Sequence, residues 1–114
     1  MKTQASFYVA GVSFEGRQEQ MKELATQFAK DNTPKPVQLV PEPENEHDLG
    51  KAIRVEAFTR TGWLPIGYVP RTANEEIGKM LTAKRIENAR LVSVGRPAFD
   101  KPIGGKVVFD VEVV

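Results

Sequence analysis

The sequence has 114 residues, enough to bury a core of its own, and we expect residues 1–114 to form a single domain. It contains no cysteine, which excludes disulfide bonds, thiolate metal sites and cysteine nucleophiles. The formal net charge is only +1, and no segment approaches the ~20 apolar residues of a membrane-spanning helix, so we expect a cytoplasmic protein without a membrane partner.

Charge is distributed unevenly along the chain. Residues 1–50 carry five Lys and Arg against eight Asp and Glu, whereas residues 51–114 carry eleven against seven. The second half is therefore basic, and a fold that gathers those residues on one face would attract an anionic partner.

Hydrophobic periodicity predicts two helices. The first begins near Arg17, and its apolar residues recur at spacings of three and four, which makes one buried stripe. The second is expected over residues 72–83, with Thr72 or Asn74 as its amino-terminal cap and Gly78 as its weakest position.

Six short strands are predicted around these helices. Period-two alternation and apolar runs indicate strands within residues 7–12, 37–40, 52–57, 64–69, 91–94 and 106–113. Thr61-Gly62 predicts a tight hairpin. The prolines around residues 37–40 indicate a strand near a sheet edge or one with short ladders. The sequence therefore predicts a mainly β fold, a small six-stranded antiparallel barrel with two packed α-helices.

The stretch EPENEHDLGKAIR, residues 42–54, concentrates acids around the only histidine. Its spacing is not that of a calcium-binding EF-hand loop, and a zinc site would need further His or Cys ligands. His47 is also the only imidazole that could serve a Ser or Thr nucleophile, and no phosphate-binding glycine loop is present. We therefore expect no metal, no cofactor and no enzymatic activity.

Aromatic and basic residues follow the predicted strands. Phe14 and Arg17 come after the first, Trp63 and Tyr68 lie in the fourth, and Arg71 comes just beyond it. Nucleic-acid bases stack on aromatic faces while Arg and Lys hold phosphates. Spacing alone favours the alternative, in which Phe14 and Trp63 belong to the core and the two arginines are solvated.

Three segments, AGVSFEGRQ, LVPEPENEHDLGKAIRVE and PIGYVPR, together resemble the HIRAN domain in order and spacing, from about residue 9 to residue 71. The resemblance implies a compact barrel related to the OB-fold. It also implies a non-enzymatic module that binds single-stranded DNA, in the best-understood example at a free 3′ end, as part of DNA repair. The residues that match the binding positions of that family are Phe14, Arg17, Asn45, His47, Asp48, Tyr68 and Arg71.

The resemblance also implies a role for individual residues. Phe14 is similar to the aromatic residue that stacks on a base, and Asp48 to the carboxylate that accepts a hydrogen bond from the 3′-hydroxyl. Asn45 belongs to the same motif as Asp48. Tyr68 stands where the DNA-binding example has a histidine, and Arg71 stands at a basic position.

Departures from the family pattern keep alternatives open. Ser13 occupies the place of an arginine, His47 that of a tyrosine, and Lys51 that of an asparagine, with one residue more in that segment. Four acids between residues 42 and 48 oppose the approach of a polyanion. The alternatives are a protein-interaction module that keeps the barrel, with a protein partner in DNA processing, or an accessory domain of a metal-dependent hydrolase.

Overall fold

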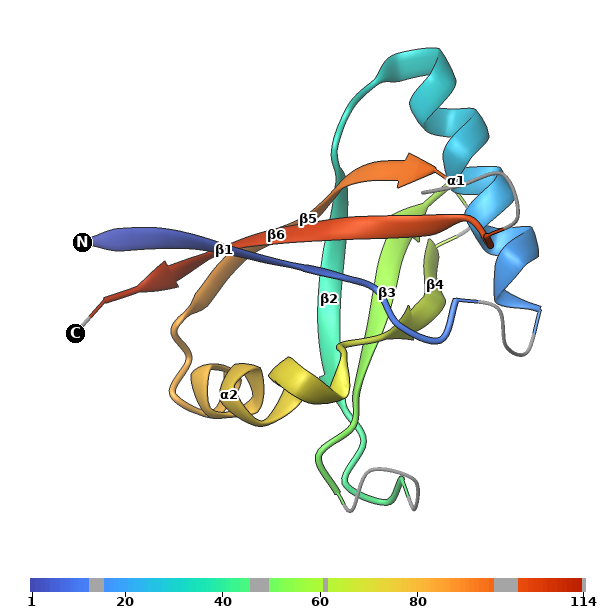
Figure 1. Cartoon of the computed structure of the whole chain (residues 1–114). Helices are drawn as coiled ribbons and strands as arrows, with labels where there is room; N and C mark the ends of the chain where they lie inside the picture. Colours follow the sequence, from blue (N-terminus) through green and yellow to red (C-terminus); the bar gives the residue numbers. More distant parts are fainter. Residues whose placement is uncertain (13–15, 46–49, 61, 96–100, 114) are drawn as a thin grey trace.

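The computed structural model describes residues 1–12, 16–45, 50–60, 62–95 and 101–113. The elements follow the predicted order of strand, helix, three strands, helix and two strands (Figure 1). They are β1 (Lys2–Tyr8), α1 (Arg17–Asp31), β2 (Lys35–Pro41), β3 (Ile53–Thr59), β4 (Gly62–Tyr68), α2 (Arg71–Thr82), β5 (Ile86–Gly95) and β6 (Gly104–Glu112).

The strands form one sheet in the order β1-β6-β5-β2-β3-β4, and every neighbouring pair is antiparallel. The mainly β fold with two helices is confirmed. The sheet is not closed into the expected barrel, because its edge strands β1 and β4 share no ladder. A single bridge between Ala10 and Tyr68 joins the chain just after β1 to the end of β4.

Buried residues of the sheet and of both helices form one hydrophobic core. Met21 and Leu24 of α1 are fully buried, and Ile77 of α2 is 5% exposed. In β3 and β6 alternate residues point inward, as the period-two pattern predicts. Phe109 of β6 meets Phe7 of β1 with ring centroids 6.1 Å apart.

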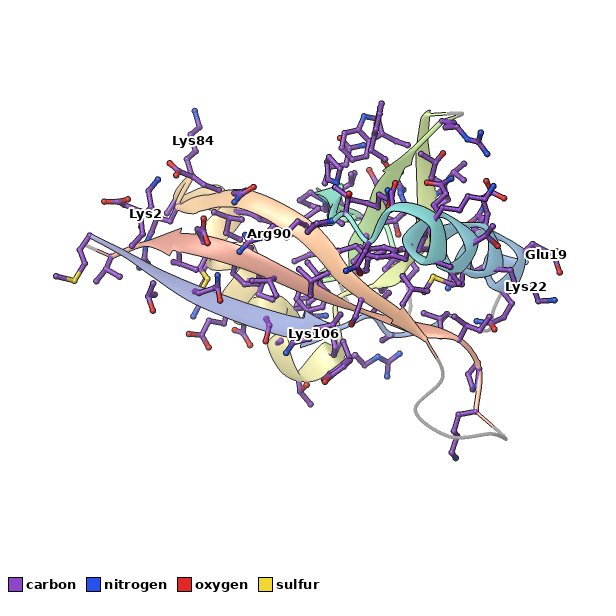
Figure 2. The ribbon with its side chains drawn as sticks, turned by 90° about the horizontal axis from the view of Figure 1, so that it is seen from above. Lys2, Glu19, Lys22, Lys84, Arg90 and Lys106 are labelled. Carbon is purple, nitrogen blue, oxygen red and sulfur yellow. The ribbon has the colours of Figure 1, made fainter. Side chains whose placement is uncertain are left out.

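Two strands are longer than their apolar runs indicate. The first strand occupies Lys2–Tyr8 and not residues 7–12, because an edge strand with one solvated face alternates polar and apolar residues. For the same reason β5 begins at Ile86, well before the run at residues 91–94, and its outward Arg90 pairs with Asp110 at 3.5 Å (Figure 2).

The turn predictions had mixed outcomes. The hairpin connection is confirmed, since Thr59 at the end of β3 pairs with Gly62, which is the first residue of β4, while Thr61 of the predicted turn lies outside the described residues. Strand β2 is central and not an edge, but its ladder with β5 has only two pairs, at Lys35 and Pro36. Helix α2 begins at Arg71 after Pro70, and no side chain caps it, so the capping role expected for Thr72 or Asn74 is wrong.

Candidate functional site

The segment after β1 crosses the end of β4 and brings two of the three sequence motifs into contact. The backbone amides of Ala10 and Tyr68 each donate to the other residue's carbonyl oxygen at 2.8 Å. Gly67 makes this approach possible, because a β-carbon there would lie less than 3.0 Å from the Ala10 carbonyl oxygen and the Val9 side chain. Close packing against Ala10 therefore explains the glycine in the segment PIGYVPR.

Arg17 is a buried charge at the start of α1. Its guanidinium donates to the carbonyl oxygen of Gly11 at 2.6 Å, and its Cζ lies 5.0 Å from the centre of the Tyr68 ring. The residue is only 8% exposed. A cation over an aromatic face is attracted by the negative charge on that face, so Arg17 both ties the start of α1 to Gly11 and fixes the Tyr68 ring.

Glu42 joins the second motif to the same tyrosine. Its Oε1 accepts hydrogen bonds from the Tyr68 hydroxyl at 2.7 Å and from Asn45 Nδ2 at 3.2 Å. Its Oε2 accepts from Nη1 of Arg54, whose Nε also donates to Glu56 at 2.8 Å. Arg54 and Tyr68 are cross-strand partners in β3 and β4, which places both side chains on the outer face of the sheet.

These contacts shift two ionisation equilibria in opposite directions. Burial raises the pKa of Glu42, but the hydrogen bonds from Tyr68, Asn45 and Arg54 together outweigh it, so the net pKa is lowered. The hydrogen bond to Glu42, followed by burial, raises the pKa of Tyr68. The carboxylate is therefore charged and the phenol neutral at neutral pH, which keeps the donor and the acceptor matched.

The structure brings together Arg17, Asn45 and Tyr68 of the seven predicted site residues, through Glu42 and the Tyr68 ring. Arg71 is exposed three residues further along, at the start of α2. The three remaining predicted residues, Phe14, His47 and Asp48, lie outside the described residues.

Sequence reasoning missed how the site is held together. Glu42 is one of the acids of the stretch at residues 42–54, considered there for metal binding and for repulsion of a polyanion, and the sequence assigns no role to Arg54. The signal that could have found them is the pairing of β3 with β4, which sets Arg54 opposite Tyr68. The alternative interpretation from spacing alone is wrong for Trp63, which is 41% exposed, and for Arg17, which is buried, whereas Arg71 is exposed as that alternative expects.

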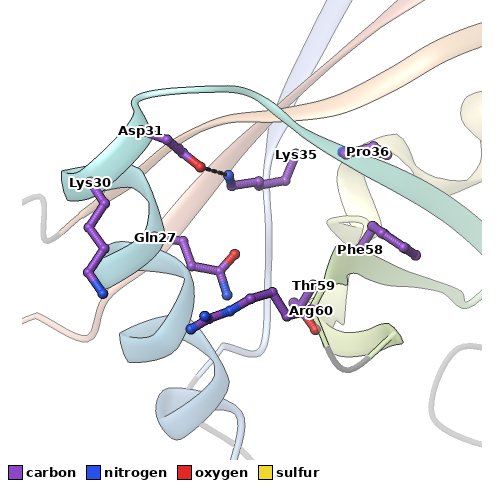
Figure 3. Close-up of a pocket in the computed structure, with 8 residues that line it drawn as sticks. All are labelled: Gln27, Lys30, Asp31, Lys35, Pro36, Phe58, Thr59 and Arg60. Atoms are coloured by element: carbon purple, nitrogen blue, oxygen red, sulfur yellow. Dashed lines mark hydrogen bonds and ion pairs between the residues drawn. The ribbon is translucent and has the colours of Figure 1, made fainter.

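A hollow of about 350 Å³ lies away from this network, between the carboxyl end of α1 and strands β2 and β3 (Figure 3). Two of the cations that line it, Lys35 and Arg60, have acidic partners on the same surface. Lys35 donates to Asp31 at 2.7 Å and lies 5.6 Å from the centre of the Phe28 ring, while Arg60 is 3.7 Å from Glu23. An incoming anion would have to compete with these acids.

Two absences concern only the part of the chain that the structure describes. In it, no three His, Asp or Glu side chains gather where they could hold a metal ion. Neither of the two helices is long and apolar enough to cross a membrane.

Comparison with protein families matches the HIRAN domain over residues 3–112. The chain is a member of the HIRAN domain family. The match spans nearly the whole chain, and it includes the second helix and the last two strands, which the three sequence motifs do not reach. HIRAN domains are nucleic-acid-binding modules, and binding rather than catalysis is their role. No curated protein and no solved structure matches this HIRAN domain.

Proposed function

We propose that this HIRAN domain captures single-stranded DNA at a free 3′ end. The observation that carries the proposal is the convergence of three distant motifs on Tyr68, which is contacted by Ala10 and Arg17 from the first and by Glu42 from the second. Such a junction of loops on a rigid sheet is where a small binding site is normally built.

Each residue has a separate role in this proposal. Phe14 and His47 stack on bases, and Asp48 accepts the hydrogen bond of the 3′-hydroxyl. Asn45 holds the start of the segment that contains His47 and Asp48. The side-chain amide of Asn45 already donates to Glu42, and the backbone carbonyl oxygen of Asn45 accepts from the Gly50 amide at 3.5 Å.

The two arginines have different roles in this proposal. Arg17 positions the Tyr68 ring and adds positive potential from its buried place beside it. Arg71 binds phosphate from the exposed start of α2, where the positive end of the helix and the lack of acids in the first turn favour an anion.

Fluorescence anisotropy with 5′-labelled single strands tests the proposal. We expect salt-sensitive binding, and tighter binding of a strand with a free 3′-hydroxyl than of one blocked by a 3′-phosphate. Asp48→Ala should remove that difference. Glu44→Ala is the matched control, because Glu44 is an exposed acid of the same segment, and its loss should strengthen binding to both ends alike. Equal binding of both ends by the unmodified protein would overturn end recognition.

A second candidate function has one observation in its favour. Phe58 and Trp63 form an exposed edge-to-face pair, with centroids 5.2 Å apart, on the β3–β4 hairpin. Exposed aromatic residues of this kind are enriched in protein interfaces. A protein-interaction module would show no binding to single strands at low salt, and loss of partner binding in the variant Trp63→Ala.

A further inference from the structure

A row of three cross-strand partners crosses the outer face of β1, β6 and β5. Tyr8 pairs with Lys106, and Lys106 pairs with Ser93. Tyr8 is 69% exposed, which is unusual for an aromatic residue within a strand, and Lys106 Nζ lies 5.9 Å from the centre of its ring. The row therefore presents an aromatic face, a cation and a hydroxyl side by side.

A hollow of about 640 Å³ opens beside this row. Val9, Val12 and Pro102 supply its apolar walls, and Lys101 and Lys106 its charge. Its described lining contains no carboxylate. The volume, the apolar walls and the few polar groups of this hollow are typical of a subsite for a small ligand. The positive charge of its two lysines favours an anionic ligand.

The outer face of β3 and β4, on the other side of Tyr68, differs in charge from the hollow beside Tyr8. There Glu42 and Glu56 share Arg54, so that this surface holds two carboxylates for one guanidinium. An approaching phosphate would be repelled by the unmatched negative charge. Of the surfaces that flank Tyr68 within the described part of the chain, the one beside Tyr8 is therefore the better route for a polyanion.

The hollow also shares a segment of the chain with the candidate site. Its wall residues Val9 and Val12 belong to the same short segment as Ala10, which pairs with Tyr68. The Val9 amide donates to the Gly105 carbonyl oxygen at 2.9 Å, which ties this segment to β6. Tyr8 is two residues before Ala10, a span of at most about 7 Å in extended chain, so a strand seated at Tyr68 can follow this segment toward Tyr8.

We propose that the hollow beside Tyr8 is a second nucleotide subsite, where the DNA strand held at Tyr68 stacks a base on the Tyr8 ring and sets a phosphate against Lys106. This inference rests on the proposed function and adds to it the direction of the strand, away from the acidic β3–β4 face and onto β1 and β6. Figure 2 shows Lys106 on this face, whereas Lys84 lies beyond the opposite end of β5.

The test combines an abasic scan of the DNA with substitutions in the protein. Affinities are measured by anisotropy for 3′-hydroxyl strands that lack one base at successive positions from the 3′ end. In the unmodified protein, one abasic position near that end should weaken binding about fivefold or more, the loss of one stacked base. In the Tyr8→Ala protein the same abasic position should cause no further loss, since base and ring act as one pair.

Matched variants separate stacking from charge and from misfolding. Tyr8→Phe keeps the ring and should therefore keep the sensitivity to the abasic position. Trp63→Ala removes an exposed aromatic residue from the other face and should keep the sensitivity to the abasic position. Lys106→Ala should lower the salt dependence of binding by about one phosphate contact, and Lys84→Ala should leave it unchanged.

The two proposals fail in different ways. If the Tyr8→Ala protein responds to every abasic position as the unmodified protein does, the subsite is overturned while capture of the 3′ end stands. If sensitivity is lost in the Trp63→Ala protein instead, the strand runs over the β3–β4 face and the inference is wrong. If the unmodified protein binds no single strand at low salt, both proposals fall.

Discussion

The hydroxyl of Tyr68 donates a hydrogen bond of 2.7 Å to Oε1 of Glu42, and the bond links the end of β4 to the loop that follows β2. Tyr68 also has Arg17 against its ring and Ala10 against its backbone. One side chain therefore connects three segments that are distant in sequence. Its ring and its hydroxyl do separate tasks, and substitutions can tell them apart.

Tyr68→Phe removes only the hydroxyl. We expect the free energy of unfolding to fall by about 1 kcal/mol, because a partly buried carboxylate loses one of its donors. DNA binding should change little, since the ring remains. Tyr68→Ala should weaken binding as well, through loss of the ring and of its contact with Arg17. Urea denaturation and anisotropy on the same samples measure the two effects.

The control for the hydroxyl is Tyr8→Phe, since the Tyr8 side chain is largely exposed. Its stability should match that of the unmodified protein. If the Tyr68→Phe protein is as stable as the unmodified protein, Glu42 finds another donor and the Tyr68 hydroxyl does not fix the loop after β2.

Stability should fall in acid because of Glu42. The net pKa of Glu42 is lowered in the folded protein from its ordinary value of 4.5. A carboxyl whose pKa is lower in the folded state stabilises the fold above its unfolded pKa, and this contribution is lost as the pH falls through the folded pKa. The loss should thus begin below about pH 5 and continue below pH 4.

Urea denaturation at neutral and acid pH tests this in the Glu42→Gln protein. A glutamine retains an acceptor but cannot ionise, so the variant should be less stable near pH 7 and lose less on acidification. Glu44→Gln, a change at an exposed acid two residues away, should keep the acid dependence of the unmodified protein. An unaltered pH profile in Glu42→Gln would assign the acid sensitivity to other carboxyl groups.

The sequence predicted the fold better than the site, for a physical reason. Strand and helix order follow from local periodicity, and the hairpin at Gly62 from local turn chemistry, so both could be read from neighbouring residues. The long first strand was missed, because its polar outward residues conceal the alternation around Ala5 and Phe7.

The site depends on contacts that periodicity does not contain. Glu42 and Tyr68 are 26 positions apart, and only the register of β2, β3 and β4 brings them together. The burial of Arg17 likewise depends on a carbonyl group and a ring from other segments. The family resemblance assigned binding roles to Arg17, Asn45 and Tyr68, but none to Glu42 or Arg54, which hold the others in place.

Gly67 should tolerate no side chain. In Gly67→Ala the β-carbon would lie less than 3.0 Å from the backbone of Ala10, which cannot move away without breaking the bridge to Tyr68. We expect a loss of more than about 2 kcal/mol in the free energy of unfolding. Because the bridge joins two motifs, single-strand binding should be lost with it, even at temperatures where the protein stays folded.

Gly78 provides the matched comparison. It lies within α2, and the nearest atom to an added β-carbon is Ile53 Cδ1 at 3.8 Å, an ordinary contact. Gly78→Ala should therefore stabilise the protein by about 0.5–1 kcal/mol through helix propensity. The unfolding temperature should fall in the Gly67→Ala protein and rise in the Gly78→Ala protein. A change of the same sign and size in both would refute the role given to the bridge between Ala10 and Tyr68.

Arg71 should contribute to DNA affinity by charge alone. It is exposed at the first position of α2, where the helix end also favours a phosphate. Arg71→Ala should weaken binding to all sequences alike and reduce the slope of log affinity against log salt concentration by about 0.7 to 1, the release of one counterion. Lys79→Ala, a change at an exposed cation in the last turn of the same helix, should leave the slope unchanged. If the Lys79 variant reduces the slope as much as the Arg71 variant, the positive field of the whole helix holds the strand and no single phosphate contact at Arg71 is needed.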